Sequence, residues 1–524
     1  MGKCRQISIL VARLCARFAH DRAGAAAIIF ALALIPMLGS VGVAVDYSRA
    51  NSLRAKLQSG ADAAALAAGK NQSGSEAERR VIANEVFAAN ATQLKFTDAY
   101  KLTYKDVDDG AASRVDVSAK VPTTISGLLG INEITVNVRA ETGRSGGTME
   151  IVMVVDTSGS MEGSRTSTLK KAARDLVKTL FGSENNHPSI SIGIVPFAAA
   201  VNVGPENESA SWMDRNAVAK YHFNNFGSKQ LTRFEIYDEL KNVKWDGCVE
   251  ARPYPLDVDD STPVSSNRDS YFVPLLAPDA PDTDAGWRKD DFINNYLSDD
   301  GGDCSRSDRA DDSAKGRQER VCKYKGSRAD TSARYGTKMG PNFLCDARPL
   351  TPLTNKKGDL NSAIGQLTSY GGTNIHEGVM WGWRVLSPGA PFTEGKPYSD
   401  NKNKKIMIVM TDGSNFHGAF NNMNGSWYSV YGYASEDRLG TGLYSTNQLV
   451  EAMNNRTLEA CSNAKKKGIM VYTIAFDVND RDTLAIMESC ASSRSMAYNS
   501  KSTGDLLTAF DDIAKKLGEL RLAK

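Results

Sequence analysis

The chain lacks several motifs on which common kinds of chemistry depend. Its 524 residues include only 8 cysteines and 5 histidines, and no two cysteines form a Cys-x-x-Cys pair, which argues against a zinc ribbon. A Gly-x-x-x-x-Gly-Lys-Ser/Thr loop is also missing, which argues against an ATPase of that class. The formal net charge is only +2, without the basic excess typical of proteins that bind nucleic acids. We therefore expect no nucleic-acid partner.

Charge is also absent from one stretch near the N-terminus. Residues 25–45, AAAIIFALALIPMLGSVGVAV, are long enough to span a bilayer as a helix. Basic residues are in modest excess in residues 1–24, which favours a cytoplasmic tail, a single-pass helix in the cell membrane and an extracytoplasmic location for the rest. A cleaved signal peptide is the alternative, with residues 42–44 as the nearest match to a cleavage site.

The few cysteines are unevenly distributed along the chain. Two precede the apolar stretch, and the six that follow it are Cys248, Cys304, Cys322, Cys345, Cys461 and Cys490. An even number beyond a membrane is compatible with three disulfides, and unpaired thiols are the alternative. Cys461 and Cys490 flank the apolar run 469–476, and we expect them to pair. The other four are expected to pair with one another, in a connectivity that spacing does not fix.

Two short apolar runs end abruptly in polar residues. Residues 151–155 lead into Asp156, Ser158 and Ser160, and residues 406–410 lead into a Thr-Asp-Gly sequence. Unbroken apolar runs of this length are typical of strands buried on both faces of a parallel sheet. Ligands bind at the carboxyl ends of such strands, and carboxylate and hydroxyl oxygens suit Mg²⁺ or Mn²⁺.

The order Asp156-x-Ser158-x-Ser160, then Thr373, then Asp412 after a later strand resembles the von Willebrand factor type A domain with its metal-ion-dependent adhesion site (MIDAS). The resemblance implies that Ser158, Ser160 and Thr373 are hydroxyl ligands and that both aspartates act mostly through coordinated waters. It implies bound Mg²⁺, or Mn²⁺ or Ca²⁺, with one position left for a carboxylate of a protein partner. The alternative is a type A domain whose loops are held by hydrogen bonds alone.

Strands and helices alternate around these loops, in residues 148–200 and 348–524. This alternation predicts an α/β fold, a doubly wound, mostly parallel sheet that is Rossmann-like. The expected further strands are 189–199 and 469–476, and the expected helices are 169–181, 360–367, 374–386, 446–467 and 503–520.

The N-terminal region resembles TadE/TadG-like proteins of bacterial tight-adherence (Flp-type) pilus assembly. The similarity rests on Gly24-Ala-Ala-Ala, the apolar stretch, Asp46, Leu57-Gln58 and the alanine-rich run 61–67. Related pseudopilins carry a Glu five residues after a processing Gly, where this chain has Ile29, and this difference favours a TadG-like anchor. The resemblance implies an inner-membrane protein with a periplasmic bulk and a pilus or envelope component as partner.

Residues 46–147 are expected to form a small α+β domain. Helical patterns cover 50–70 and 75–92, and a period of two, typical of strands, covers 114–121 and 134–139, with 101–107 as a third strand. The simplest interpretation is a stalk that holds the metal site away from the bilayer. A pilin-like layout is the alternative.

The helix–strand pattern stops in residues 201–347, which we interpret as an inserted, disulfide-containing subdomain. Its aromatic residues form either a small core or a partner groove: Trp212, Tyr221, Trp245, Tyr254, Tyr271, Phe272 and Trp287. Its aspartates lack EF-hand spacing, so a solvated acidic loop is favoured over a calcium site: Asp299, Asp300, Asp303, Asp308, Asp311 and Asp312.

The sequence favours binding over catalysis. A hydrolase would need Ser158 or Ser160 with His376 or His417, but neither serine lies in a Gly-x-Ser-x-Gly elbow. We therefore expect no enzyme. The leading hypothesis is a membrane-anchored, metal-dependent binding protein of the tight-adherence pilus system. The alternative is a structural scaffold of the pilus base or envelope, in which the metal only orders the loops.

Overall fold

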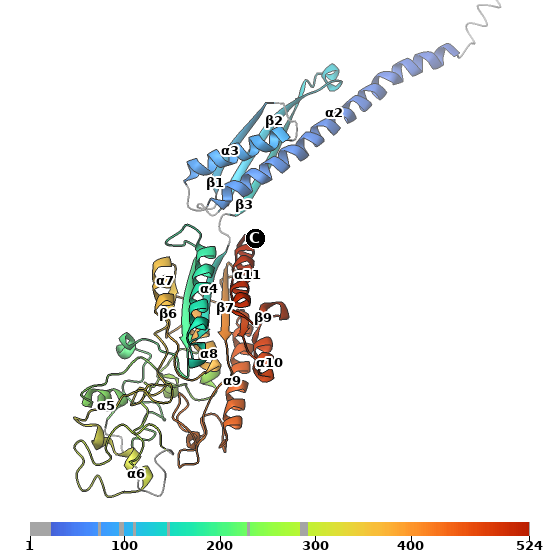
Figure 1. Cartoon of the computed structure of the whole chain (residues 1–524). Helices are drawn as coiled ribbons and strands as arrows, with labels where there is room; N and C mark the ends of the chain where they lie inside the picture. Colours follow the sequence, from blue (N-terminus) through green and yellow to red (C-terminus); the bar gives the residue numbers. More distant parts are fainter. Residues whose placement is uncertain are drawn as a thin grey trace, which may run out of the picture. The chain divides into compact units, whose positions relative to one another are not determined.

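The computed structural model describes residues 23–71, 75–93, 99–107, 112–143, 147–227, 231–282 and 292–522. Nearly all of the predicted cytoplasmic tail, and residues 144–146 of the linker, lie outside these ranges. The chain divides into two compact units, residues 1–145 and 146–524 (Figure 1). Each unit is described by itself below.

In the first unit, one long helix carries both the apolar stretch and the segment that follows it. Helix α2 spans Ala23–Lys70. Large apolar side chains between Ile29 and Val45 are mostly exposed, at 66% for Ile29, and within the described residues α2 is the one helix apolar and long enough to cross a membrane. From residue 46 onward one side of α2 is buried, including Leu53 and Leu57. The helix therefore has an unburied apolar part and a part that packs within the unit.

A three-stranded antiparallel sheet completes this unit, together with a second helix (Figure 1). The strand order is β1-β2-β3, and the elements are α3 (Glu76–Gln93), β1 (Tyr100–Val107), β2 (Ala112–Pro122) and β3 (Glu133–Gly143). Along β2, Val115, Val117 and Ala119 are buried against the helices while their neighbours are more exposed. The period of two thus follows from burying one face only.

Asp46 connects α2 to the loop between β2 and β3. Its carboxylate accepts backbone N–H groups from Thr124 at 3.0 Å, Ile125 at 3.1 Å and Ser126 at 2.9 Å. The side chain is 2% exposed, so an acidic residue directly after the apolar stretch is buried with a full set of donors. Hydrogen bonds to a charged acceptor stabilise this junction more than neutral ones would.

The second unit is built on a six-stranded, mostly parallel sheet with the order β6-β5-β4-β7-β8-β9. Only the short edge strand β6 runs antiparallel to its neighbour. The strands are β4 (Thr148–Asp156), β5 (Ile190–Phe197), β6 (Thr351–Thr354), β7 (Asn403–Thr411), β8 (Met470–Phe476) and β9 (Ala497–Ser500). The unit is thus a mixed α/β structure whose sheet is dominated by parallel pairs.

Helices cover both faces of this sheet (Figure 1). One face packs against α4 (Ser164–Phe181), α7 (Lys357–Gln366) and α11 (Thr503–Leu522), and the other against α8 (Ile375–Leu386), α9 (Thr446–Lys466) and α10 (Arg481–Cys490). In β4, Ile151 and Met153 belong to the first core, while Val152 and Val154 belong to the second. Because both faces of the sheet are covered, the sequence of this strand is a continuous apolar run without alternating polar residues.

The long connection in residues 201–347 shares the core on the α8 side of the sheet. It contains the short helices α5 (Arg233–Glu239) and α6 (Ala314–Glu319) and otherwise mainly turns. The Phe272 ring lies 5.1 Å from Trp381 of α8 and 5.7 Å from Trp212. Trp212, Tyr221, Trp245 and Phe272 are buried, Tyr271 is partly buried, Tyr254 is 54% exposed, and Trp287 lies outside the described residues. Most of these aromatic residues therefore serve packing.

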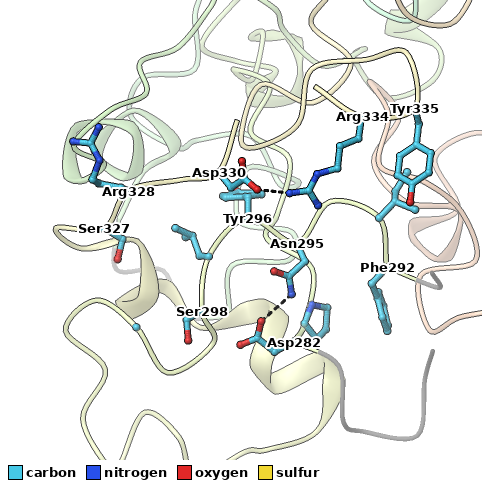
Figure 2. Close-up of a pocket in the computed structure, with 14 residues that line it drawn as sticks. Asp282, Phe292, Asn295, Tyr296, Ser298, Ser327, Arg328, Asp330, Arg334 and Tyr335 are labelled. Atoms are coloured by element: carbon cyan, nitrogen blue, oxygen red, sulfur yellow. Dashed lines mark hydrogen bonds and ion pairs between the residues drawn. The ribbon is translucent and has the colours of Figure 1, made fainter. Parts of the chain in front are cut away.

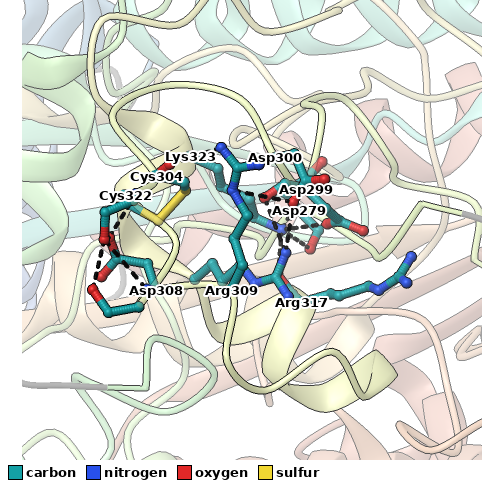
Figure 3. The surroundings of a disulfide bond; sticks show 12 residues. Asp279, Asp299, Asp300, Cys304, Asp308, Arg309, Arg317, Cys322 and Lys323 are labelled. Carbon is teal, nitrogen blue, oxygen red and sulfur yellow. Dashed lines mark hydrogen bonds and ion pairs between the residues drawn. A yellow bond between two sulfur atoms is a disulfide. The ribbon is translucent and has the colours of Figure 1, made fainter.

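Three disulfides connect the six cysteines of this unit. The pairs are Cys248–Cys345, Cys304–Cys322 and Cys461–Cys490. Near the second pair, basic side chains form ion pairs with some of the aspartates of the acidic segment (Figure 3). The Lys323 ammonium lies 2.8 Å from Asp279 and 3.2 Å from Asp299, and Arg317 lies 2.8 Å from Asp312. Asp299 is buried in this cluster, while Asp300, Asp303, Asp308, Asp311 and Asp312 are exposed.

Candidate metal centre

The five predicted ligands lie in three loops at the carboxyl edge of the sheet. Asp156 is the last residue of β4, and Asp412 directly follows β7. These strands are parallel neighbours, and Val155 pairs with Met410, so both aspartates leave the sheet side by side. Thr373 lies two residues before α8. Ser158 and Ser160 follow β4 in the first loop.

Hydroxyl and carboxylate oxygens of the first and third loops contact each other directly. Ser160 Oγ donates a hydrogen bond to Asp412 Oδ1 at 2.5 Å, and Ser158 Oγ lies 3.0 Å from Ser160 Oγ. A Cβ atom added at Gly413 would lie 3.9 Å from Thr373 Oγ1 and 4.0 Å from Ser160 Oγ. Ser158 and Ser160 therefore meet Asp412, more than 200 residues away in sequence, and Thr373 lies beside this oxygen cluster.

Asp156 forms the buried floor of this cluster. It is 0% exposed, and its two oxygens accept hydrogen bonds from the Ser158 N–H at 2.8 Å and from Thr411 Oγ1 at 2.6 Å. Burial, and next the charge of Asp412, raise the pKa of Asp156 to about 6. Two carboxylates that repel in this way would be stabilised by a cation between them. Ser160 is exposed, so the cluster opens to solvent on its side.

The donor set fits a hard divalent cation. All five candidates offer oxygen, the donor that Mg²⁺, Mn²⁺ and Ca²⁺ prefer. Within the described ranges, no group of three or more His, Cys, Asp or Glu side chains could hold a metal, so a site here depends on its hydroxyls. The residues that would hold the ion are Asp156, Ser158, Ser160, Thr373 and Asp412.

Arg165 also reaches the cluster, and the sequence reasoning missed it. Its Nη1 lies 2.7 Å from Asp412 Oδ2, and its Nη2 lies 2.6 Å from Asp477 Oδ2, just after β8. The apolar periodicity predicted that the helix would begin at residue 169, whereas α4 begins at Ser164. The sequence did offer one signal: Arg165 is a basic residue five positions after Ser160, and it lies in the first turn of α4.

The insertion contacts the second metal loop through backbone hydrogen bonds. The Gly371 N–H donates to the Gly336 carbonyl at 3.0 Å, and the Gly371 carbonyl accepts the Gly159 N–H at 2.9 Å. Gly371 has φ +82°, and a Cβ atom there would overlap Asp346 Oδ2. Asp346 itself accepts the Thr337 hydroxyl at 2.7 Å. The insertion, the Thr373 loop and the Ser158–Ser160 loop are thus joined in series.

The two histidines that follow metal loops in sequence are buried and engaged elsewhere. His376 Nδ1 lies 2.7 Å from the Tyr431 hydroxyl and Nε2 lies 2.9 Å from the Asp257 carbonyl, while His417 Nε2 lies 3.0 Å from Ser429 Oγ. Burial lowers the pKa of His376 to about 3 and that of His417 to about 4. Neither ring is therefore poised to act as a general base.

A cavity of about 860 Å³ is lined by residues of the insertion (Figure 2). Asn295 Nδ2 donates to Asp282 Oδ1 there at 2.9 Å, and Arg334 forms an ion pair with Asp330. These polar side chains are paired with one another rather than directed at a common point. The oxygen cluster at the edge of the sheet is therefore the stronger candidate for a functional site.

Several solved structures are similar to this chain, but only weakly. The pilus adhesin SpaC from Lactobacillus rhamnosus GG is 13% identical, with a TM-score of 0.33, and the match covers 80% of this chain and 33% of that one. The von Willebrand factor domain of the type V pilus tip protein Mfa5 from Porphyromonas gingivalis is 10% identical, with a TM-score of 0.32 and coverage of 71% and 95%. Proximal thread matrix protein 1 from the mussel byssus, with a zinc-occupied MIDAS motif, is 12% identical, with a TM-score of 0.29 and coverage of 71% and 46%.

These likenesses are too weak to carry an argument about this chain, which spans about a third of SpaC. No curated protein matches it. A family match is confined to α2 and the two residues after it. Residues 24–72 match the family described as "Putative Flp pilus-assembly TadE/G-like", which relates this segment to the Tad pilus family.

Proposed function

We propose that the protein is a TadG-like component of a tight-adherence pilus system that binds a protein partner through a divalent cation. In this proposal residues 25–45 cross the inner membrane, residues 1–24 are cytoplasmic, and the bulk is periplasmic. Residues 46–147 form a stalk, and residues 148–200 with 348–524 form a von Willebrand factor type A domain. Residues 201–347 are its disulfide-containing insertion.

The observation that carries this proposal is the convergence of oxygen ligands from three loops. The two aspartates, Ser158 and Ser160 lie together, with Thr373 beside them, and this group is buried at Asp156 and open at Ser160. When bound, the ion, Mg²⁺ or in its place Mn²⁺ or Ca²⁺, supplies a Lewis-acidic point for one carboxylate oxygen of the partner. A charge-assisted contact of this kind is stronger than a neutral hydrogen bond.

The chain's own residues keep this cluster in place. Thr411 and the Ser158 N–H orient Asp156 through its two oxygens. Ser160 holds Asp412 from the other side. Because these contacts exist within the folded loops, little ordering is required when a partner arrives, which favours affinity.

Aromatic side chains near the loops support a protein as the partner. Tyr370 and Phe416 are 37% and 46% exposed, and both flank the Thr373 loop: the Phe416 N–H donates to the Thr373 carbonyl at 2.9 Å. Tyr335, which precedes Gly336 of the insertion, is 66% exposed. Tyrosine and phenylalanine are enriched in protein interfaces, where they bury apolar area beside polar anchors.

Crosslinking in native membranes tests this proposal. We expect capture of a partner in Mg²⁺ and its loss in EDTA, in Ser160→Ala and in Thr373→Val. Ser167→Ala, on the exposed side of α4, is the matched control and should capture normally. Ser160 is preferable to Asp156 as a target because Asp156 is buried and its loss would leave its donors without a partner.

A structural scaffold remains the second candidate function. It would be favoured if the same partner were captured equally well in EDTA and by Ser160→Ala. Deleting residues 201–347 does not separate the two functions, because Phe272 of the insertion packs directly on Trp381 of α8. Point substitutions at the metal loops are therefore the informative variants.

A further inference from the structure

Arg165 places a positive charge at the edge of the oxygen cluster. Arg165 uses one side of its guanidinium for Asp412 and the other for Asp477, at 2.7 and 2.6 Å. The Asp412 carboxylate is fully buried, the Arg165 side chain is 33% exposed, and the Asp477 side chain is 41% exposed. The charge of the arginine is thus fixed between a candidate metal ligand and a solvent-facing carboxylate.

Asp477 takes an uncommon backbone conformation at this position. Its φ is +54°, in the left-handed region that residues other than glycine seldom adopt. Its N–H donates to the Ser500 carbonyl of β9 at 2.7 Å, which holds the turn after β8. A non-glycine residue held in this region beside a site is a reason to look for a function of its side chain. Here the side chain reaches the arginine.

Asp412 is therefore shared. Its Oδ1 accepts the Ser160 hydroxyl, and its Oδ2 accepts Arg165. A cation held by the loops would therefore approach an Asp412 carboxylate that is already paired with the positive charge of Arg165. We propose that Arg165 is a built-in competitor that lowers the affinity of the cluster for divalent cations, and that Asp477 offsets this by sharing the guanidinium. This inference rests on the proposed metal-binding function.

The opposite role for Arg165 is positioning. If the guanidinium mainly holds Asp412 in place, its removal would loosen a ligand and weaken binding of the ion. Electrostatic competition predicts the reverse sign. A unit charge acting on a divalent ion at a partly exposed site corresponds to roughly a tenfold change in affinity at low salt, and the change shrinks as salt screens it. The sign of the change therefore separates the two roles.

Three substitutions distinguish these effects. Arg165→Gln removes the charge and keeps a polar side chain, and we expect it to bind Mn²⁺ roughly tenfold more tightly. Arg165→Lys keeps the charge without the two-pronged geometry, and its affinity should stay within about threefold of wild type. Asp477→Asn removes one of the two carboxylates that the guanidinium shares, and it should bind Mn²⁺ several-fold more weakly.

The experiment is a Mn²⁺ titration of the full-length protein in detergent, followed by the electron paramagnetic resonance signal of the free ion at low ionic strength. Thermal unfolding with and without Mn²⁺ is measured in parallel. Arg165→Gln should unfold at a lower temperature in EDTA, because it loses two ion pairs, yet gain more from Mn²⁺ than wild type does. This combination is not expected of a purely structural residue.

The outcomes are distinct. If wild type binds no Mn²⁺, the proposed metal function fails. If wild type binds Mn²⁺ and Arg165→Gln binds it equally or more weakly, the competition inference fails while the metal function stands. A variant that does not fold is identified by its unfolding curve in EDTA, and Arg165→Lys and Asp477→Asn then decide: Asp477→Asn binding more tightly than wild type would overturn the inference.

Discussion

Gly371 offers a sharp test of whether the insertion organises the metal loops. Its N–H and carbonyl connect Gly336 of the insertion to Gly159 of the first metal loop, at 3.0 and 2.9 Å. In Gly371→Ala, a residue with a side chain would have to adopt φ +82°, which costs about 1–2 kcal/mol. Its Cβ would also overlap Asp346 Oδ2, so the loop or Asp346 must move.

We therefore expect Gly371→Ala to lower the free energy of unfolding by at least about 2 kcal/mol. The displaced loop carries Thr373, so Mn²⁺ affinity should fall about tenfold or more, the equivalent of 1.4 kcal/mol. Gly372→Ala is the matched control. Its Cβ would meet Phe416 and Ala199 at 3.5 and 3.7 Å, which are ordinary contacts, and its φ is not positive.

The assays are thermal unfolding and Mn²⁺ titration of both variants beside wild type. Adding Asp346→Ala to Gly371→Ala relieves the overlap but not the backbone strain, so it should restore only part of the loss. If Gly371→Ala and Gly372→Ala behave alike in both assays, the contact between the insertion and the metal loops contributes neither to stability nor to Mn²⁺ affinity.

Three further predictions concern other parts of the chain. Replacing Cys248 and Cys345 by serine opens a disulfide with a sequence separation of 97 and should cost about 4–5 kcal/mol in unfolding free energy; an equal Tm in reducing and oxidising buffer would contradict this. Burial lowers the pKa of His376 to about 3 from its ordinary 6.5, so the unfolded chain binds more protons, and stability present above pH 6.5 is lost as the pH falls toward 3. At pH 5 the loss relative to pH 7.5 should be about 2 kcal/mol in urea unfolding, and His376→Gln should show a shallower pH dependence; an identical slope would refute the assignment. Asp46→Asn keeps the shape but removes the charge that accepts three N–H groups, so it should weaken the first unit by about 1–3 kcal/mol and speed amide exchange at residues 124–126; unchanged exchange would count against it.

Long elements with a clear period could be predicted from the sequence. Strands β4 and β7 stood out because sheets covered on both faces leave no polar positions in a strand, and α9 stood out by its length. The four-residue strands β6 and β9 and the ten-residue helix α10 were missed. Such short elements depend on neighbours that the local sequence does not reveal.

The sequence predicted the metal loops but not the residues that contact them. The position of Asp156, Ser158 and Ser160 at the carboxyl end of β4 could be predicted because a buried apolar run ends there in oxygen-bearing residues. Arg165 was missed because the apolar period of α4 begins five residues after the helix itself. The contact between Gly371 and Gly336 could not be predicted, because it uses backbone atoms of a glycine and of a segment without periodicity.

The contacts made by the insertion could not be predicted from local sequence patterns. Its aromatic residues suggested a core or a groove, but one of them, Phe272, packs on Trp381 of α8, which comes later in the chain. Its six aspartates suggested a calcium site only weakly. Three of them instead form ion pairs with Lys323, Arg320 and Arg317. The contact of Phe272 joins segments more than 100 residues apart, whereas the ion pairs form within residues 299–323, where no regular period marks which side chains meet.

Anomalous diffraction from crystals of the protein grown with Mn²⁺ measures the location of the ion itself. The account predicts one strong peak per chain, about 2.0–2.2 Å from the hydroxyl oxygens of Ser158, Ser160 and Thr373. A peak at another position, or none at these hydroxyls when the ion is present in excess, would contradict it.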